Sequence, residues 1–382
     1  MHRRQLAMVT VIAVSAMLTW AAPAAGAEEP VPTHRKLNLP VAKYVDVSVA
    51  TSWIKPGTNR PRIDDAAISN PADPQRWVFS MSIDDKFGLN DLLETQSLYG
   101  TKVIVDEQVA LGGLLWDHAW VIGQPTPRDT SHYGGYPGWI PDQQLTAQPP
   151  AESSGRTARV TGDQSGPEHS TASSVNAWAY DSPRAAMARN GVGRVMKLSF
   201  GTTLPVARAR QHWVETLSNH GEHWYFNPAD VSLTTPPATG ARVVATARRF
   251  LGLGYLWAGT SGFGYDCSGF VHELYASLGV TIPRDTDAQA AAAGDPKYTG
   301  PVQTGSATGT WIPTMAELRP GDVVFFATDS GYIHHDGVYV GYVNGHPTMI
   351  NSPHTGAFVE QAAIDTGTWA REFAGGGRYL PS

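Results

Sequence analysis

The strongest periodic pattern in the chain begins at Cys267. Apolar residues occupy positions 270, 271, 274, 275 and 278, and Gly279 follows them. This spacing places the apolar side chains along one side of a helix, and a glycine at that point is typical of a helix end. The pattern therefore predicts a buried helix with Cys267 in its first turn.

Other parts of the chain show the shorter period of strands. Residues 77–145 and 177–233 contain brief apolar runs separated by turn residues, which is typical of small antiparallel β-barrels. Residues 332–341 and 347–353 are further strand-like runs, whereas helical spacing marks the segment that starts at Val243. The fold class that these patterns predict is α+β.

Changes in composition predict the domain boundaries. The segment 28–75 mixes Pro, Asn and Asp with few apolar periods, and the segment 146–174 is too poor in large apolar residues to form its own core. The predicted order is a signal peptide at 1–27, an irregular lead-in at 28–75, a first barrel at 76–145, a linker or long loop at 146–174, a second barrel at 175–235 and a mixed domain at 240–382.

The N-terminal segment has the features of an export signal. Arg3 and Arg4 precede an apolar run from Leu6 to Trp20, and Ala25-Gly26-Ala27 matches an A-x-A cleavage site. The apolar core is shorter than the ~20 residues that span a bilayer. We therefore expect a secreted or cell-wall-associated, extracytoplasmic protein with no stable membrane insertion after signal removal.

The composition argues against several classes of function. Lys and Arg number 28 against 34 Asp and Glu, and no long basic cluster follows the signal, so nucleic acid is not an expected partner. The 13 His show no H-E-x-x-H or Cys-paired spacing, and the glycines of 252–264 do not complete a dinucleotide fingerprint. We expect no metal and no cofactor, and the sequence indicates no oligomeric state.

The chain contains a single cysteine, which cannot form a disulfide within the chain. Cys267 is then either a buried, inert thiol or a reactive one. At a helix start, unpaired N–H groups and the helix dipole favour the thiolate and lower the pKa of the thiol. That position suits a catalytic nucleophile, which also needs a base.

The best candidate base lies in the strand-like run that contains His334 and His335. Along a strand His335 shares a face with Tyr339, opposite Val338, so its ring could face the helix start while His334 lies at the surface. Asn351, in the next strand-like run, is a candidate for orienting the imidazole, although an Asn before Ser-Pro is also ordinary turn chemistry.

Four motifs follow one another in this region, and in order and spacing they resemble the NlpC/P60 family of papain-like cell-wall peptidases across residues 240–382. The motifs are Tyr255-Leu256-Trp257-Ala258-Gly259, Asp266-Cys267-Ser268-Gly269-Phe270, Leu318-Arg319-Pro320-Gly321-Asp322-Val323-Val324-Phe325-Phe326 and His335-Asp336-Gly337-Val338-Tyr339-Val340-Gly341. The resemblance implies a triad of Cys267, His335 and a third polar residue. Many members have a second His there, and Asn351 takes that place here.

Two barrels before such a domain resemble the SH3-domain-containing γ-D-glutamyl-L-diamino acid endopeptidases of the dipeptidyl-peptidase VI type. The implied architecture is a papain-like NlpC/P60 domain preceded by two small SH3-like β-barrels. In that group the first barrel closes one end of the groove and holds the free amine of L-Ala, which implies this task for Glu94 and Tyr136. Alternatively, Glu94 is an ordinary solvated carboxylate and Tyr136 is only a packing side chain. The other implied substrate contacts are Tyr255, Trp257, Asp266, Ser268 and Thr286.

The stretch from Leu111 to Tyr133 departs from that group, because it looks longer than the corresponding loop. It carries Trp116, His118, Trp120 and His132. An insertion of this kind could reshape or cover the groove.

The function implied by the resemblance is that of a cysteine endopeptidase. Its substrate would be the γ-D-glutamyl-diamino acid bond of peptidoglycan stem peptides with a free N-terminal L-Ala, so peptidoglycan peptides are the expected partner. Two alternatives stay open. One is a hydrolase of intact, crosslinked peptidoglycan, and the other is a non-catalytic wall-binding protein.

Overall fold

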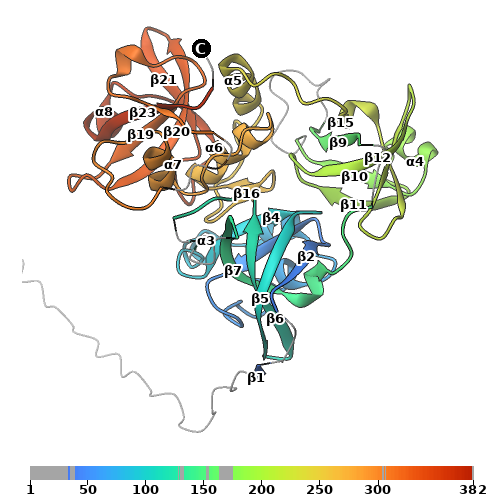
Figure 1. The fold of residues 1–382 in the computed structure, drawn as a ribbon. Helices are drawn as coiled ribbons and strands as arrows, with labels where there is room; N and C mark the ends of the chain where they lie inside the picture. Colours follow the sequence, from blue (N-terminus) through green and yellow to red (C-terminus); the bar gives the residue numbers. More distant parts are fainter. Residues whose placement is uncertain are drawn as a thin grey trace, which may run out of the picture. The chain divides into compact units, whose positions relative to one another are not determined.

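Strands dominate the described part of the chain, where they form three antiparallel sheets of six to eight strands and one of two strands (Figure 1). The computed structural model describes residues 33–34, 39–127, 129, 133–151, 155–162, 175–302, 305 and 307–380. The predicted signal peptide at 1–27 lies outside these residues, as do parts of the predicted lead-in and linker.

The first sheet has the strand order β4-β3-β7-β6-β5-β2-β8, and β1 pairs with β5. Three short helices separate β3 from β4, and they cover a core that contains Trp53, Trp77 and Trp116. The elements are β1 (Thr33–His34), β2 (Val41–Val45), β3 (Val49–Trp53), α1 (Asp65–Ile68), α2 (Pro74–Ser80), α3 (Ile83–Phe87), β4 (Leu93–Leu98), β5 (Lys102–Leu111), β6 (Leu114–Ile122), β7 (Gly135–Pro141) and β8 (Leu145–Thr146).

One sequence expectation for this region was wrong. Residues 41–53, expected in an irregular lead-in, form β2 and β3, because two five-residue strands broken by polar residues leave too short a period to recognise. Most of the expected insertion is strand β6 and its turn. Within it Trp116 is buried in the core, His118 and Trp120 bind the Asp106 carboxylate at 2.6 Å each, and His132 lies outside the described residues.

The second sheet has the order β11-β10-β14-β13-β12-β9-β15. Its elements are β9 (Thr157–Val160), β10 (Ala177–Tyr180), α4 (Pro183–Ala188), β11 (Arg194–Leu198), β12 (Thr203–Ala209), β13 (Val214–Leu217), β14 (His223–Phe226) and β15 (Val231–Ser232). Strand β9 falls in the segment expected to be a linker or loop, and it pairs with β12 and β15. The segment has too little apolar surface for its own core, but Ala158 and Val160 are fully buried in the core of this sheet.

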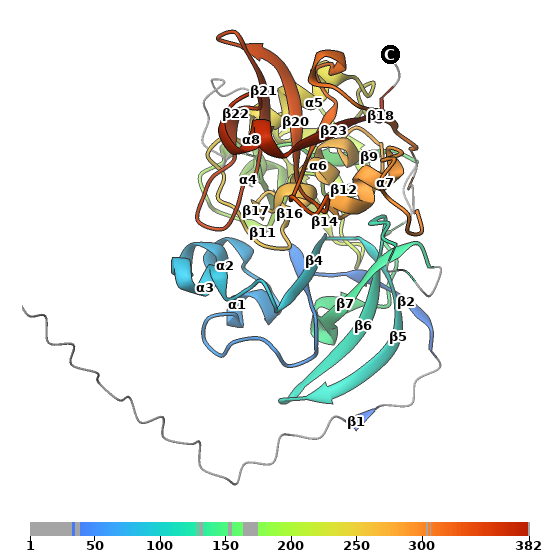
Figure 2. The same ribbon diagram turned by 90° about the vertical axis from the view of Figure 1, so that its left-hand side faces the viewer.

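The third sheet has the order β18-β23-β19-β20-β21-β22 and carries helices on both faces (Figure 2). Side chains of α5, α6 and α7 share one core with Val338 and Val340 of β20, whereas α8 packs on the other face with Phe326 and Tyr339. The elements are α5 (Gly240–Arg248), β16 (Thr260–Ser261), β17 (Gly264–Tyr265), α6 (Cys267–Ala276), α7 (Thr286–Ala292), β18 (Thr310–Ile312), β19 (Val323–Ala327), β20 (Ile333–Val343), β21 (His346–Asn351), β22 (Glu360–Ala363), α8 (Gly367–Glu372) and β23 (Phe373–Arg378).

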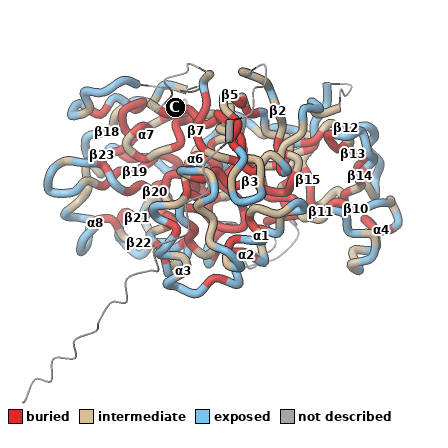
Figure 3. Tube along the Cα trace, turned by 90° about the horizontal axis from the view of Figure 1, so that it is seen from below, coloured by how far each residue is buried: buried red, intermediate tan, exposed pale blue. Residues whose placement is uncertain are grey.

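Each of the three large sheets contains buried residues, which are drawn in red in Figure 3. Leu256 and Ala258, from the segment before α6, are buried in the tryptophan-containing core of the first sheet. Phe200 of the second sheet packs edge-on against Phe250, which follows α5, with ring centroids 5.1 Å apart. The segment before α6 therefore makes apolar contacts with the core of the first sheet and with Phe200, which follows β11. Among the described residues, no helix is long and apolar enough to cross a membrane.

A buried carboxylate at one of these contacts makes stability depend on pH. Glu273 of α6 is 9% exposed, and burial raises its pKa from 4.5 to about 8, while Arg159 of β9 opposes the shift. Between these pH values the folded protein keeps a proton that the unfolded chain releases, so the free energy of unfolding should fall as pH rises.

We predict that Glu273→Gln removes this part of the pH dependence, since the amide does not titrate. Thermal unfolding from pH 4.5 to about 8.5 should show a shallower decline in Tm for the variant than for the wild type. Glu360→Gln, at an exposed position of β22, is the control and should follow the wild-type curve. Parallel curves for all three proteins would contradict the prediction.

Candidate active site

Cys267 opens helix α6, and the residues around it explain why the helix starts there. The Asp266 carboxylate accepts a hydrogen bond from the Gly269 N–H at 2.7 Å, which caps the first turn. A Cβ atom on Gly269 would lie 2.1 Å from the Gly259 carbonyl oxygen, so this close approach requires glycine. The Cys267 Sγ lies 3.7 Å from the Thr286 Oγ1 at the start of α7.

His335 lies near the start of β20 and is fixed by two neighbours. Its Nε2 is 3.0 Å from the Asn351 Oδ1, and its ring stacks on Trp369 with centroids 4.8 Å apart. Because a carbonyl oxygen only accepts hydrogen bonds, Nε2 carries the proton and Nδ1 of the neutral ring has a free lone pair. This tautomer provides a base at Nδ1.

Gly337 permits the contact between His335 and Asn351. A Cβ atom at this position would lie 2.9 Å from the Asn351 Cβ and 2.8 Å from the Met349 Sδ, both on the neighbouring strand β21. Only a residue without a side chain lets the two strands bring the imidazole and the amide together at this point.

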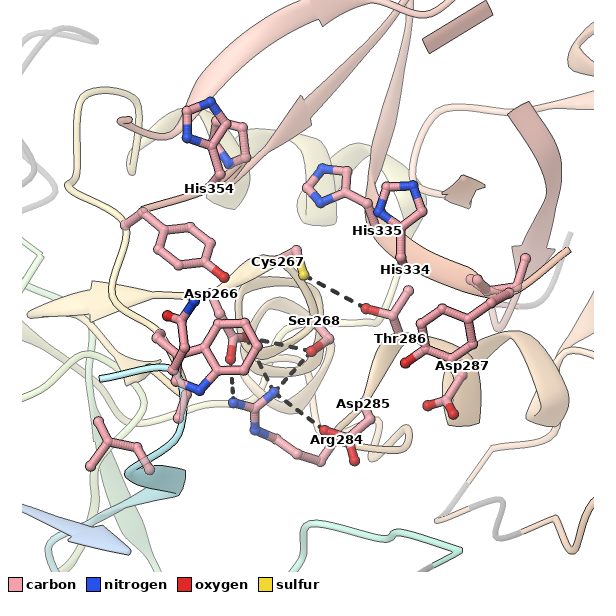
Figure 4. A pocket seen from close by; sticks show the side chains of 18 of the residues that line it. Asp266, Cys267, Ser268, Arg284, Asp285, Thr286, Asp287, His334, His335 and His354 are labelled. Carbon is pink, nitrogen blue, oxygen red and sulfur yellow. Dashed lines mark hydrogen bonds and ion pairs between the residues drawn. The ribbon is translucent and has the colours of Figure 1, made fainter. Parts of the chain in front are cut away.

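Successive side chains of β20 alternate between its two faces as expected, and α6 packs on the face opposite to that of His335. Val338 shares the core of α6, whereas His335 and Tyr339 lie on the face that packs with α8. The strand face that carries His335 is thus covered by α8 rather than by α6. Cys267 and His335 nevertheless line the same cleft, one from α6 and one from the start of β20 (Figure 4).

The electrostatic environment favours a neutral pair of side chains. Burial raises the pKa of the Cys267 thiol well above its usual value, and the Asp266 carboxylate acts in the same direction. The lowering of the thiol pKa that was expected from the helix start is therefore smaller than the increase caused by burial. Burial also lowers the pKa of His335 to about 4. At neutral pH the two side chains are therefore a protonated thiol and a neutral imidazole.

Arg284 connects the start of α6 to the first sheet (Figure 4). Its guanidinium is 1% exposed and binds both oxygens of Asp266 at 3.2 and 2.6 Å and the Ser268 hydroxyl at 2.9 Å. Its Nε donates to the Thr95 hydroxyl of β4 at 3.1 Å. The backbone N–H of Arg284 also donates to the Pro125 carbonyl at 3.0 Å. The side chains of Asp266 and Ser268 therefore both accept hydrogen bonds from Arg284.

Three oxygen-bearing side chains line the cleft where it meets the first sheet. The Tyr136 hydroxyl of β7 donates to the Asp285 Oδ1 at 3.2 Å, and Glu94 of β4 lines the same part of the protein surface. Burial raises the pKa of Asp285 to about 6, while Arg284 and Tyr136 oppose the shift. Sequence reasoning missed Asp285, although its place between Arg284 and Thr286 in the implied substrate motif was a signal.

The cleft has a volume of about 980 Å³. It is lined by every predicted site residue except Asn351, which lies behind His335. Tyr255 is buried, whereas Trp257 is 37% exposed. Around Cys267 the lining also includes Asp285, Asp287, Tyr332, His334, His354 and Trp369. Within the described ranges, no group of three or more His, Cys, Asp or Glu side chains could hold a metal ion.

A thiol at a helix start and an imidazole on a strand, both open to one cleft, are the parts of a papain-like thiol hydrolase. A model of the NlpC/P60 family matches residues 252–378. A γ-D-glutamyl-L-lysine dipeptidyl-peptidase of Bacillus cereus is 34% identical over 349 residues, which cover 88% of this chain and 91% of that protein. A protein of the same name from Bacillus subtilis is 29% identical over 85% of this chain and 94% of its own length.

The structural comparison agrees with the sequence comparison. A crystal structure of an NlpC/P60 family protein from Bacillus cereus matches with a TM-score of 0.70 and 32% identity, covering 89% of this chain and 100% of that one. The chain therefore belongs to the NlpC/P60 family and is a peptidase. The family resemblance noted in the four sequence motifs is confirmed.

We predict that Arg284→Met lowers the free energy of unfolding by about 3–5 kcal/mol, because it leaves the buried Asp266 carboxylate without its cation. Urea unfolding followed by fluorescence measures the loss. Arg208→Met is the matched control, since Arg208 pairs with Glu215 through a side chain that is 58% exposed, and it should change stability by less than about 1 kcal/mol. Equal effects of the two substitutions would contradict the prediction.

Proposed function

We propose that the chain is a cysteine endopeptidase that hydrolyses the γ-D-glutamyl-diamino acid bond of peptidoglycan stem peptides with a free N-terminal L-Ala. The observation that carries the proposal is the cleft itself. It contains Cys267 and His335, and its lining extends to Tyr136 and Glu94 of the first sheet. The relatives named γ-D-glutamyl-L-lysine dipeptidyl-peptidases, aligned over most of both chains, support the bond type.

In the proposed reaction Cys267 is the nucleophile and His335 the base. The Nδ1 of His335 takes the thiol proton, and the thiolate attacks the γ-carbonyl carbon of D-Glu. Unpaired N–H groups of the first turn of α6 stabilise the oxyanion. The imidazolium then gives its proton to the amine of the departing diamino acid. Water, activated by His335, hydrolyses the thioester and restores the thiol.

Asn351 has a supporting role in this proposal. Its Oδ1 accepts the Nε2 proton of His335 at 3.0 Å, so it fixes the ring orientation and the tautomer that leaves Nδ1 basic. The stack on Trp369 restricts the same ring. Tyr255 lines the same cleft as Cys267, and burial raises the pKa of its phenol, so the hydroxyl keeps its proton.

Specificity for a free amine follows from the charge of the first-sheet end of the cleft. An ammonium there would meet the carboxylates of Asp285 and Glu94 and the hydroxyl of Tyr136, a set with the opposite charge. An N-acetylated peptide has no such charge. The cleft thus favours released peptides over crosslinked wall, in which the L-Ala nitrogen is part of an amide.

The proposed architecture and location complete this picture. We propose that the first two sheets are SH3-like barrels and that the third sheet with its helices is the catalytic domain, with the signal peptide at 1–27 directing the protein to the wall or the medium. Trp257, Ser268 and Thr286 are the remaining proposed substrate-facing residues, since they line the cleft beside Cys267.

Mass spectrometry of an L-Ala-γ-D-Glu-diamino-acid tripeptide incubated with the purified protein tests the proposal. We predict cleavage after γ-D-Glu, at least about 100-fold slower cleavage of the N-acetylated peptide, and a loss of more than about 1,000-fold in Cys267→Ala. Full activity of that variant would refute the thiol mechanism. Cleavage of intact wall alone would favour the crosslinked substrate, and retention on wall without release would indicate a binding protein.

We also predict that KM for the free-amine tripeptide rises as pH falls below about 6, because protonation of Asp285 removes a negative charge that attracts the ammonium. In Asp285→Asn, KM should be raised already at pH 7 and should change little down to about pH 5. The substrate amine stays protonated across this range. An unchanged pH dependence of KM in the variant would assign the titration to another group.

A further inference from the structure

Asp336 lies next to His335 in β20 but on the opposite face of the strand. This is the face that carries Val338 and packs against α6. The Asp336 side chain is 0% exposed, whereas the charged groups of most proteins are rarely buried without a partner. It does not line the cleft, so it has no direct access to a substrate.

No well-formed hydrogen bond reaches either carboxylate oxygen of Asp336 from the residues that the structure describes. The Cys267 thiol and the Thr286 hydroxyl are close enough to Asp336 to lower its pKa. These two groups lie 3.7 Å from each other. Asp336, on the strand face that packs against α6, therefore lies near the pair formed by Cys267 and Thr286.

The charged groups around Asp336 do not supply a matched cation. Asp266, at the start of α6, raises its pKa, and Arg284, before α7, lowers it while being bound to Asp266. Two phenols, Tyr255 and Tyr379, feel its charge as well. Burial is the largest effect and raises the pKa of Asp336 well above its ordinary value. A carboxyl group in these surroundings keeps its proton, because an unpaired buried charge is costly.

A neutral carboxylic acid differs from a carboxylate in what it can do for a thiolate. A carboxylate would repel the negative sulfur, whereas a carboxylic acid has an O–H to donate. The Thr286 hydroxyl can pass such a hydrogen bond on, since it both accepts and donates. The same position thus either opposes or assists ionisation of Cys267, depending only on where one proton resides.

We propose that Asp336 is a positioning residue for the nucleophile: held as the neutral acid, it donates a hydrogen bond to the Cys267–Thr286 pair and stabilises the thiolate that forms when His335 takes the thiol proton. The proton of Asp336 stays on Asp336 throughout. The inference rests on the proposed role of Cys267 as nucleophile. It adds a residue that the four family motifs gave no reason to select.

The test compares Asp336→Asn and Asp336→Leu with the wild type by the pH dependence of Cys267 alkylation with iodoacetamide. Asparagine keeps a donor of the same size and leucine has none. We expect an apparent thiol pKa close to the wild-type value in Asp336→Asn and a higher one in Asp336→Leu, with kcat for the tripeptide about 10- to 100-fold lower in Asp336→Leu and KM little changed.

Three results would overturn the inference. A lower thiol pKa in Asp336→Asn than in the wild type would show that Asp336 carries a charge that repels the thiolate. Equal thiol pKa values in all three proteins, or equal losses in both variants, would show a purely structural role. If Asp336→Leu does not fold, the direction of the change in Asp336→Asn still decides between acid and carboxylate.

Asp322→Asn is the matched control, because Asp322 is also buried in this domain but is paired with Arg378 at 2.7 Å. It should lower stability and leave the thiol pKa unchanged. Alkylation needs no peptide substrate, so this readout remains valid even where the tripeptide is not cleaved. Failure of the proposed substrate and failure of the Asp336 inference are therefore distinguishable.

Discussion

The buried guanidinium of Arg284 is the interaction on which the cleft depends. It holds the carboxylate that caps α6, the hydroxyl that follows Cys267 and a threonine of the first sheet. A guanidinium has five donors in a fixed plane, so it fixes the positions of several acceptors at once. The helix start that carries the thiol is thereby oriented relative to β4 and β7, from which Glu94 and Tyr136 reach the cleft.

The chemistry around Cys267 is set by exclusion of water rather than by a permanent ion pair. Burial disfavours both the thiolate and the imidazolium, so both side chains are neutral at neutral pH. Such a site depends on accurate placement of neutral groups. The Asn351 amide, the Trp369 ring and the absence of a side chain at Gly337 supply that placement for the base.

Much of this arrangement could be predicted from the sequence, because its signals are local. The α6 helix follows from the spacing of five apolar residues, and the residues now found around the cleft were mostly within short motifs. The strands β2, β3 and β9 were missed because four or five residues carry too few periods, and their burial depends on partners far along the chain. Asp336 and Asp285 were missed because burial and the contacts of a carboxylate are set by tertiary structure.

Shared burial of Leu256 and Ala258 has a consequence for how substitutions combine. These residues lie just before α6, yet they belong to the same core as Trp53 and Trp116 of the first sheet. Substitutions in contact through one core do not add, and their coupling free energies are about 0.5–3 kcal/mol. Trp116 is remote in sequence from Cys267, but a substitution there should change the stability effect of substitutions at Leu256 and Ala258. A double-mutant cycle would measure this coupling between the first sheet and the loop that carries Tyr255 and Trp257.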